Sequence, residues 1–157
     1  MISIPIIGAE RRGAPIQAFT RYSQNDEIKL FCGIDHADYT VVFDFTLLDI
    51  PTVVSSIKSG ILIVNAPDGA NFDCISENLE IWTVDATSIS MRNGLVISGF
   101  PILNTLMLGA YAKVTGHYSL ETMKKVIEQK YGSKADKNYL GAKEAYDSVK
   151  KIREVRG

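Results

Sequence analysis

The chain has 157 residues, of which 46% are hydrophobic and 22% are charged, and its mean hydropathy is close to zero at +0.04. These values are typical of a globular chain that buries a substantial core, and we expect a single domain over residues 1–157. A formal net charge of -1 and a pI near 6.1 argue against a general nucleic-acid or anionic-membrane binder, because such proteins need a sustained basic surface.

A loop rich in arginine and glycine lies near the start of the chain, over residues 8–15 with the sequence GAERRGAP. It places Arg11 and Arg12 directly before Gly13. Guanidinium groups offer a rigid fork of donors that suits phosphate or carboxylate, and glycine lets the backbone approach a ligand closely. The loop fits an anion-binding site, and equally a solvated loop whose arginines pair with acidic groups of a partner chain.

Apolar and polar side chains alternate over residues 16–23, which predicts a half-buried strand. A polar turn follows, and residues 28–32 are the expected hairpin partner. Residues 39–43 and 61–64 are short apolar runs that predict strands buried on both faces. Between these two runs, apolar residues at helical spacing predict a helix over 47–57 with Pro51 in its first turn.

Residues 79–84 predict a further strand, and Asp85 is placed to begin a helical or irregular connection. This order of elements predicts an α/β fold with a mostly parallel sheet. The carboxyl ends of parallel strands share one edge of the sheet. We therefore expect Asp44, Asn65 and Asp85, which follow the three strands, at a common rim.

The last third of the chain is predicted to be helical. One helix runs from about Asn104 to residue 114 and is ended by Gly116. Ser119 begins a second helix, which Gly132 ends and whose apolar face is Met123, Val126, Ile127 and Tyr131.

A third helix is expected over residues 137–154. Its apolar stripe includes Ile152 on the inward face, and Asp147 stands four residues before Lys151, the spacing of a helical ion pair.

Metal-binding and catalytic signals are weak. Cys32 and Cys74 are far apart in the sequence, and so are His36 and His117. Neither pair has the spacing of a zinc or iron–sulfur site, so we predict no metal site here, and any iron–sulfur cluster must be held by another chain. No nucleophile and base stand at a recognisable offset, so no catalytic residue is assigned.

No secretion leader is recognised and the uncharged residues 93–112 are broken by Gly and Pro, which favours a cytoplasmic location without a membrane span.

Asn104 and Thr105 stand at a predicted helix start, where free backbone N–H groups and the helix dipole favour an anion. Asn104 as a simple N-cap is the alternative, and the two interpretations are compatible.

Gly8 and Gly13 of the arginine loop have the spacing of a P-loop, but Ala14 and Pro15 stand where Lys and Ser/Thr are required. No G-x-G-x-x-G follows a predicted strand, so a self-contained dinucleotide site is not supported.

Three motifs in order carry a family resemblance: GAERRGAP with the following AFTR at 18–21, VDAT at 84–87, and NTLMLGA at 104–110. In combination they resemble the gamma subunit of 2-oxoacid:ferredoxin oxidoreductases, the group that includes pyruvate and branched-chain 2-oxoacid enzymes. The similarity extends over essentially the whole chain, through KVTG at 113–116 and the final helices.

The resemblance implies a Rossmann-like, three-layer α/β domain with a helical C-terminal third, inside a multi-subunit enzyme. Such enzymes decarboxylate a 2-oxoacid oxidatively to an acyl-coenzyme A and pass the electrons to ferredoxin. The resemblance makes this chain a non-catalytic component that binds no cofactor alone. Thiamine diphosphate, Mg2+ and iron–sulfur clusters then lie with alpha, beta and delta-type subunits. Arg11, Arg12 and Gly13, with Asn104 and Thr105, are the candidates for contact with a partner or with coenzyme A.

One departure from the family pattern concerns the first strand and helix, which members usually carry before the arginine loop, joined by G-x-G-G-Q-G. This chain starts almost at the loop, so it was truncated, begins inside a longer reading frame, or is completed by a separate segment. A sheet without that strand exposes ladder groups, so we expect the isolated chain to self-associate or to be unstable. A second hypothesis is a stand-alone α/β module that binds an anion or coenzyme A.

Overall fold

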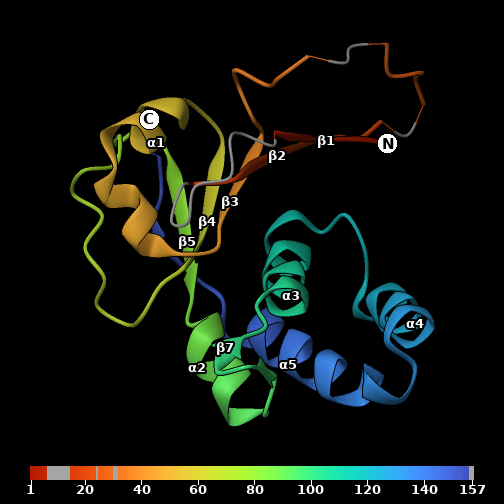
Figure 1. Ribbon diagram of the computed structural model, residues 1–157. Helices are drawn as coiled ribbons and strands as arrows, with labels where there is room; N and C mark the ends of the chain where they lie inside the picture. The colour runs from red at the N-terminus through yellow and green to blue at the C-terminus, as the bar shows by residue number, and fades with distance from the viewer. Residues whose placement is uncertain (7–14, 24, 30–31, 156–157) are drawn as a thin grey trace.

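The computed structural model describes residues 1–6, 15–23, 25–29 and 32–155 (Figure 1). At its centre is a four-stranded sheet in the order β3-β4-β5-β8. Strands β3, β4 and β5 run parallel, whereas β8 runs antiparallel to β5, so the predicted α/β fold with a mostly parallel sheet is confirmed. The strands span Tyr39–Val42 for β3, Ile61–Asn65 for β4, Glu80–Val84 for β5 and Lys150–Arg153 for β8.

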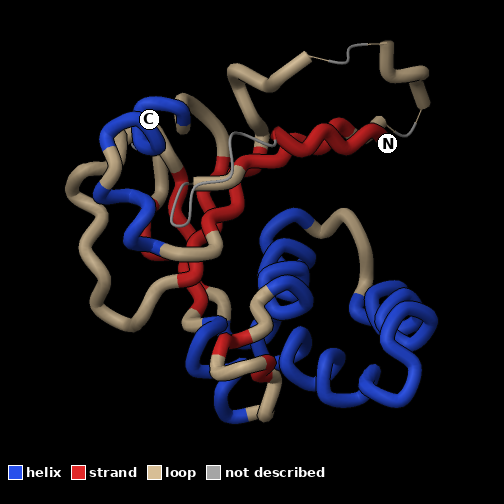
Figure 2. Tube along the Cα trace, viewed as in Figure 1, coloured by secondary structure: helices blue, strands red, loops and turns tan. Residues whose placement is uncertain are grey.

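Helical layers cover both faces of this sheet (Figure 2). Successive side chains of a strand point to opposite faces, so β4 sends Leu62 and Val64 into one layer and Ile63 into the other. The first layer holds the 3₁₀ helix η1 and helix α1, the second holds α2, α3 and α5, and α4 packs on α5. These elements span Phe45–Asp49 (η1), Pro51–Ser56 (α1), Ala86–Arg92 (α2), Asn104–Thr115 (α3), Leu120–Tyr131 (α4) and Ala135–Ser148 (α5).

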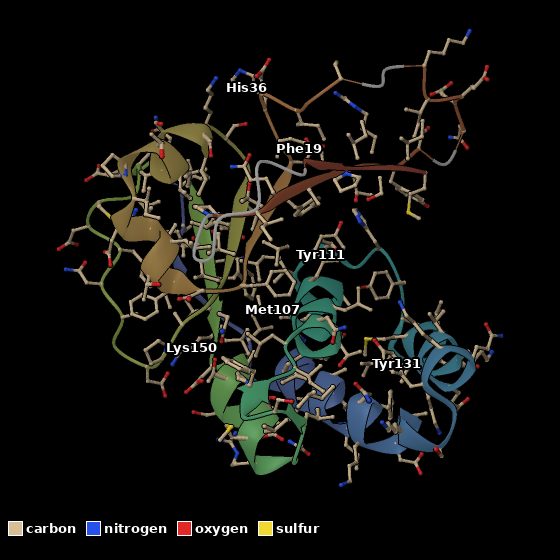
Figure 3. The ribbon with its side chains drawn as sticks, in the orientation of Figure 1. Phe19, His36, Met107, Tyr111, Tyr131 and Lys150 are labelled. Atoms are coloured by element: carbon tan, nitrogen blue, oxygen red, sulfur yellow. The ribbon has the colours of Figure 1, made fainter. Side chains whose placement is uncertain are left out.

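Helices α3 and α5 pack with their backbones close together. A Cβ atom at Gly109 would collide with the carbonyl oxygen of Ala142, and one at Gly141 would lie 2.8 Å from Leu95 Cδ1. On the sheet side of α3, Met107 is buried in the core (Figure 3). Glycine at these two positions therefore sets how closely α3 and α5 pack against each other, and how closely this helical layer packs on the sheet.

Polar residues cap the starts of two helices and a glycine follows the end of a third, as predicted. Asp85 accepts a hydrogen bond from Ser88 N at 2.8 Å at the start of α2, and Ser119 accepts one from Thr122 N at 3.1 Å at the start of α4. Gly116 follows α3 in the left-handed conformation, with φ of 64°.

The start of α3 differs from the N-cap interpretation of Asn104. Leu103 is the N-cap residue and makes no side-chain cap hydrogen bond, while Asn104 is the first helical residue. Its side-chain oxygen accepts from Thr105 N at 2.8 Å.

Helix α4 buries Met123 and Ile127, and Tyr131 is half-buried, as its apolar spacing predicts. Val126 is 50% exposed, so its predicted burial is wrong. Helix α5 covers only part of the circumference of α4, and the predicted stripe was one residue too wide.

The single helix predicted over residues 47–57 is wrong, because the segment forms η1 and α1 with a break at Ile50. Ile50 adopts extended angles, φ of -93° and ψ of 112°. A residue before proline is pushed out of the α region, and Pro51 then occupies the first position of α1, where its missing N–H costs nothing.

The predicted last helix also ends too late. Helix α5 stops at Ser148, and the next residues form β8 against β5. Ile152 is 44% exposed instead of buried. The predicted pair of Asp147 with Lys151 is wrong: Asp147 pairs with Lys143 at 2.6 Å, and Lys151 lies 3.4 Å from Glu80 on β5.

A two-stranded hairpin of β1 (Ile2–Ile6) and β2 (Gln17–Arg21) projects from the body, with the N-terminus at its far end (Figure 1). The predicted partner strand at 28–32 is wrong in its described part, because residues 28, 29 and 32 are not strand. At the end of β2, beside Ile2 and the N-terminal end of the hairpin, Arg21 Nη2 donates to the carbonyl oxygen of Gly33 at 3.0 Å. A second, short hairpin of β6 (Val96–Ile97) and β7 (Phe100–Pro101) connects α2 to α3.

The two edges of the central sheet differ in charge. In the described part of the chain, β3 pairs with β4 alone, and its four residues are uncharged. The opposite edge strand, β8, carries Lys150, Lys151 and Arg153. Charged side chains discourage further strand pairing. Within the described residues, no helix has the length and apolar character needed to cross a membrane.

We expect Gly109→Ala to lower the free energy of unfolding by about 1–3 kcal/mol, because the added methyl group forces α3 away from α5. Urea denaturation measures this loss. Gly33→Ala is the matched control, since a Cβ atom there would make an ordinary 3.7 Å contact with Phe19 Cε2. Equal stability of the two variants would contradict the close helix packing.

Candidate functional site

The three polar residues expected at one rim lie together. Asp44, Asn65 and Asp85 follow or end β3, β4 and β5, and all three line one cavity of about 390 Å³. We call this cavity the rim cleft. The prediction of a shared rim at the carboxyl ends of the parallel strands is confirmed, and such a position is where open α/β sheets commonly bind ligands.

Asn65 connects the elements around the rim cleft. Its side-chain Nδ2 donates to the carbonyl oxygen of Phe43 at 2.8 Å and to Thr87 Oγ1 at 3.0 Å, and its Oδ1 accepts from Thr87 N at 3.2 Å. The residue is only 6% exposed. One amide thus ties the end of β3 to the start of α2, and its hydrogen-bonding capacity is used inside the protein.

The two carboxylates of the rim cleft act locally as caps. Asp44 Oδ1 accepts from the backbone N of Thr46 at 3.0 Å and from its hydroxyl at 2.8 Å. Asp85 Oδ1 accepts from Ser88 N at 2.8 Å. In the described part of the chain, the second carboxylate oxygen of each residue has no protein partner.

The remaining wall of the rim cleft is mostly apolar. No lysine, arginine or histidine is among its lining residues, all of which lie in described segments. Besides the three polar residues above, the cleft is lined by Phe43, Phe45, Ala66, Pro67, Thr87, Ser88, Pro101 and Leu103.

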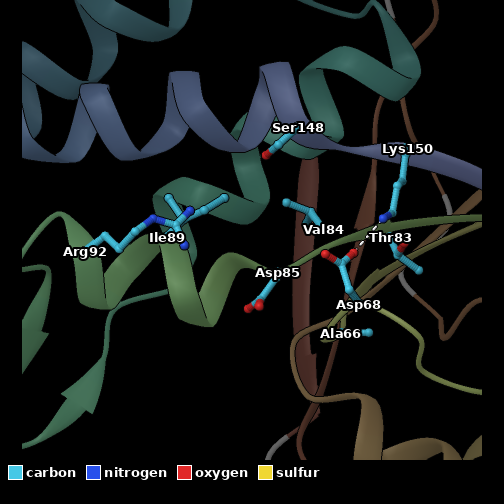
Figure 4. Close-up of a pocket in the computed structure, with 9 residues that line it drawn as sticks. All are labelled: Ala66, Asp68, Thr83, Val84, Asp85, Ile89, Arg92, Ser148 and Lys150. Carbon is cyan, nitrogen blue, oxygen red and sulfur yellow. Dashed lines mark hydrogen bonds and ion pairs between the residues drawn. The ribbon is translucent and has the colours of Figure 1, made fainter.

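A smaller cavity of about 210 Å³ lies on the other side of Asp85, between β5, α2 and β8 (Figure 4). Lys150 donates to Asp68 there at 2.5 Å, and Arg92 donates to Glu144 at 2.7 Å. The hydrogen bond from Arg92, with a second one from Asn93, lowers the pKa of Glu144. Both cations of this cavity therefore already have an acidic partner.

The predicted ligand contacts Arg11, Arg12 and Gly13 lie outside the described residues. Asn104 and Thr105 do not line the rim cleft. Asn104 donates to the hydroxyl of Tyr131 on α4 at 3.3 Å, and the Thr105 hydroxyl, on a residue that is 3% exposed, donates to Asn138 Oδ1 at 3.0 Å. These two side chains join α3 to α4 and α5.

Sequence reasoning missed an aromatic cluster between β3 and the end of α3. Tyr111 and Tyr118 have ring centroids 6.2 Å apart, and Tyr39 lies 5.3 Å from His117. The hydroxyl of Tyr111 is 3.1 Å from His117 Nδ1. The local signal in the sequence was that His117 and Tyr118 follow shortly after Tyr111, whereas Tyr39 comes from a distant strand.

A candidate metal site was not predicted. Within the residues that the structure covers, no group of three or more His, Cys, Asp or Glu side chains is placed to hold a metal ion. Cys32 and Cys74 are both exposed free thiols.

The layered sheet and its cleft at the carboxyl ends of parallel strands define a Rossmann-like α/β protein. Comparison with known proteins makes this specific. The chain belongs to the pyruvate ferredoxin/flavodoxin oxidoreductase family, whose model matches residues 1–148.

Curated relatives and a solved structure agree with this assignment. The chain is 42% identical over 151 residues to pyruvate synthase subunit PorC of Methanothermobacter marburgensis, covering 94% of this chain and 80% of the relative. It is 38% identical over 154 residues to the common gamma subunit of the pyruvate/ketoisovalerate oxidoreductases of Pyrococcus furiosus, with the same coverage. The crystal structure of pyruvate oxidoreductase subunit PORC from Thermotoga maritima superposes with a TM-score of 0.75 at 32% identity, covering 97% of this chain and 81% of that one.

We expect Asn65→Ala to lower the free energy of unfolding by about 2–3 kcal/mol, because it leaves the Phe43 carbonyl and the Thr87 amide without their partner. Chemical denaturation measures the loss. Asn78→Ala, at an exposed position, is the control and should change stability little. A loss no larger than that of the control would mean that Asn65 does not hold the rim together.

We expect the stability of the protein to fall at alkaline pH partly through Tyr118. Burial, with a smaller contribution from Tyr111, raises the pKa of Tyr118, whose hydroxyl donates to the Leu108 carbonyl at 2.9 Å. The folded state keeps this proton while the unfolded chain releases it near pH 10, so the stabilisation is complete below about pH 10 and is lost above it.

Tyr118→Phe should therefore cost about 1 kcal/mol at neutral pH and flatten the alkaline decline of the denaturation midpoint. Tyr22→Phe, on a side chain that is 57% exposed, serves as the comparison. An unchanged alkaline slope in Tyr118→Phe would contradict the assignment.

Proposed function

We propose that this chain is the gamma component of a 2-oxoacid:ferredoxin oxidoreductase. Such a complex oxidatively decarboxylates pyruvate or a related 2-oxoacid to an acyl-coenzyme A. The observation that carries the proposal is the family match over residues 1–148, together with relatives named as PorC or as a common gamma subunit. The names of these relatives support the substrate class and the presence of other subunits. A cytoplasmic location is part of the same proposal.

The chemistry of the complex is assigned to the partner subunits in this proposal. Cys32 and Cys74 come from separate segments, and the described residues bring together no metal-ligand set, so they do not fit an iron–sulfur cluster. Thiamine diphosphate, Mg2+, the clusters and the contact with ferredoxin then belong to alpha, beta and delta-type subunits. This chain contributes packing beside the active site.

Arg11, Arg12 and Gly13 are the proposed contact with a partner acid or with coenzyme A phosphate. The arginines lie in the sequence between β1 and β2. Their guanidinium groups suit phosphate or carboxylate, which is what supports this proposal. Asn104 is the exposed second candidate. Thr105 is supported by the sequence motif alone, because its hydroxyl is bonded to Asn138 and its backbone N–H to Asn104 Oδ1.

Purification of the tagged chain from its native cells, under anaerobic conditions and with mass spectrometry of all co-purifying proteins, tests the proposal. Recovery with thiamine-diphosphate-binding and iron–sulfur subunits is the expected result. Recovery of the chain alone would reject the gamma role and favour a stand-alone anion-binding module. Calorimetric titration of the pure chain with coenzyme A then tests that alternative directly.

We expect Arg11→Ala with Arg12→Ala to weaken complex assembly, or to raise the KM for coenzyme A, by at least about tenfold, because charge-assisted hydrogen bonds are lost. Stability of the isolated chain should change little. The matched control is Lys124→Ala with Lys125→Ala, two adjacent and exposed cations on α4. Equal effects of the two pairs would assign the loss to net charge and not to the arginine loop.

A further inference from the structure

We propose that the rim cleft binds an uncharged ligand that combines an apolar body with vicinal hydroxyl groups, of which a nucleoside is the simplest example. This inference goes beyond the gamma role and does not depend on it. It comes from the size of the cavity, the chemistry of its wall, and the hydrogen-bonding groups that the fold leaves unused.

The cavity has room and an apolar wall for the body of such a ligand. Its volume of about 390 Å³ lies within the range of small-molecule sites. Phe43 and Phe45 line it next to the end of β3, and Pro101 and Leu103 line it from the segment before α3. A flat apolar group between these side chains would remove aromatic and aliphatic surface from water.

The free polar groups of the rim cleft are mainly acceptors. Asp44 and Asp85 each use one carboxylate oxygen for a cap, and the second oxygen is without a partner in the part of the chain that the structure describes. Asn65 is fully engaged, so it shapes the cleft and does not compete for the ligand. A pair of ligand hydroxyls can donate to such carboxylate oxygens, as ribose does in many α/β nucleotide sites.

The charge of the cleft disfavours an anion. Two carboxylates line it, and its lining residues, all within described segments, include no cation. The nearby Arg92 and Lys150 line the smaller cavity and are paired with Glu144 and Asp68. A phosphate in the rim cleft would meet like charge in a partly desolvated site. The chemistry of the described wall therefore favours an uncharged ligand over a phosphate.

Titration of the full chain, followed by NMR chemical shifts of backbone amides, tests the ligand class. The ligands are adenosine, 2′-deoxyadenosine, adenosine monophosphate and inorganic phosphate. Adenosine should shift amides around residues 43–46, 65–67 and 85–88. Affinity should fall at least about fivefold for 2′-deoxyadenosine and about tenfold for the monophosphate. Equal or tighter binding of the monophosphate or of phosphate at these amides, or no shifts with adenosine, would overturn the proposal.

Conservative variants test which carboxylates bind the hydroxyls. Asp44→Asn and Asp85→Asn keep an oxygen for each cap, because asparagine caps helices as well as aspartate does. Each should weaken adenosine binding at least about fivefold without moving the urea midpoint. Asp68→Asn, in the smaller cavity, is the control and should bind adenosine normally. If all three variants bind equally, the carboxylates of the rim cleft are not the ligand contacts.

This experiment separates the inference from the gamma role. Assembly with partner subunits reports on the proposed function, whereas adenosine shifts in the pure chain report on the rim cleft alone. A chain that assembles but does not bind adenosine leaves the gamma role intact and rejects the ligand class proposed here.

Discussion

The amide of Asn65 is the interaction on which the rim depends. Strands β3 and β4 are held by ladder hydrogen bonds, but these do not place the segments that follow the strands. Asn65 does so by binding the carbonyl of Phe43, the first residue after β3, and both the hydroxyl and the backbone N–H of Thr87 at the start of α2. Asn65 is buried, so removing its side chain would leave buried polar groups without a partner. The free energy lost in this way is larger than the net contribution of an ordinary hydrogen bond to stability. One buried side chain therefore holds together the segments on two sides of the rim cleft.

The second constraint is steric and lies in the helical layer. Gly109 lets the backbone of α3 approach Ala142, and Gly141 makes room for Leu95 and Leu106. The segment that connects α2 to α3 is thereby held against the sheet, and it supplies Pro101 and Leu103 to the cleft wall. Packing between two helices thus determines the shape of a cavity to which neither helix contributes its central residues.

Much of this arrangement could be predicted from local chemistry. The strands β3, β4 and β5, the caps Asp85 and Ser119, and the shared rim follow from apolar runs, short polar caps and the rule that parallel strands end at one edge. The family resemblance was confirmed along most of the chain. One error arose where a distant partner decides: residues 150–153 were predicted to be helical, because a helical pattern does not show their pairing with β5. The other error was local, because Pro51 pushes Ile50 out of the α region although the apolar spacing continues through it.

The unequal edges of the sheet have a consequence for how copies of the chain, or the chain and a partner, can meet. Lys150, Lys151 and Arg153 lie on one edge strand, whereas the four residues of β3, the other edge strand in the described part of the chain, are uncharged. Sheet growth that uses both edges would build an open-ended polymer, while growth from one edge closes after a single addition. The charges of β8 therefore disfavour strand pairing at its edge, and an association through the other edge alone would give a finite pair and not a fibre.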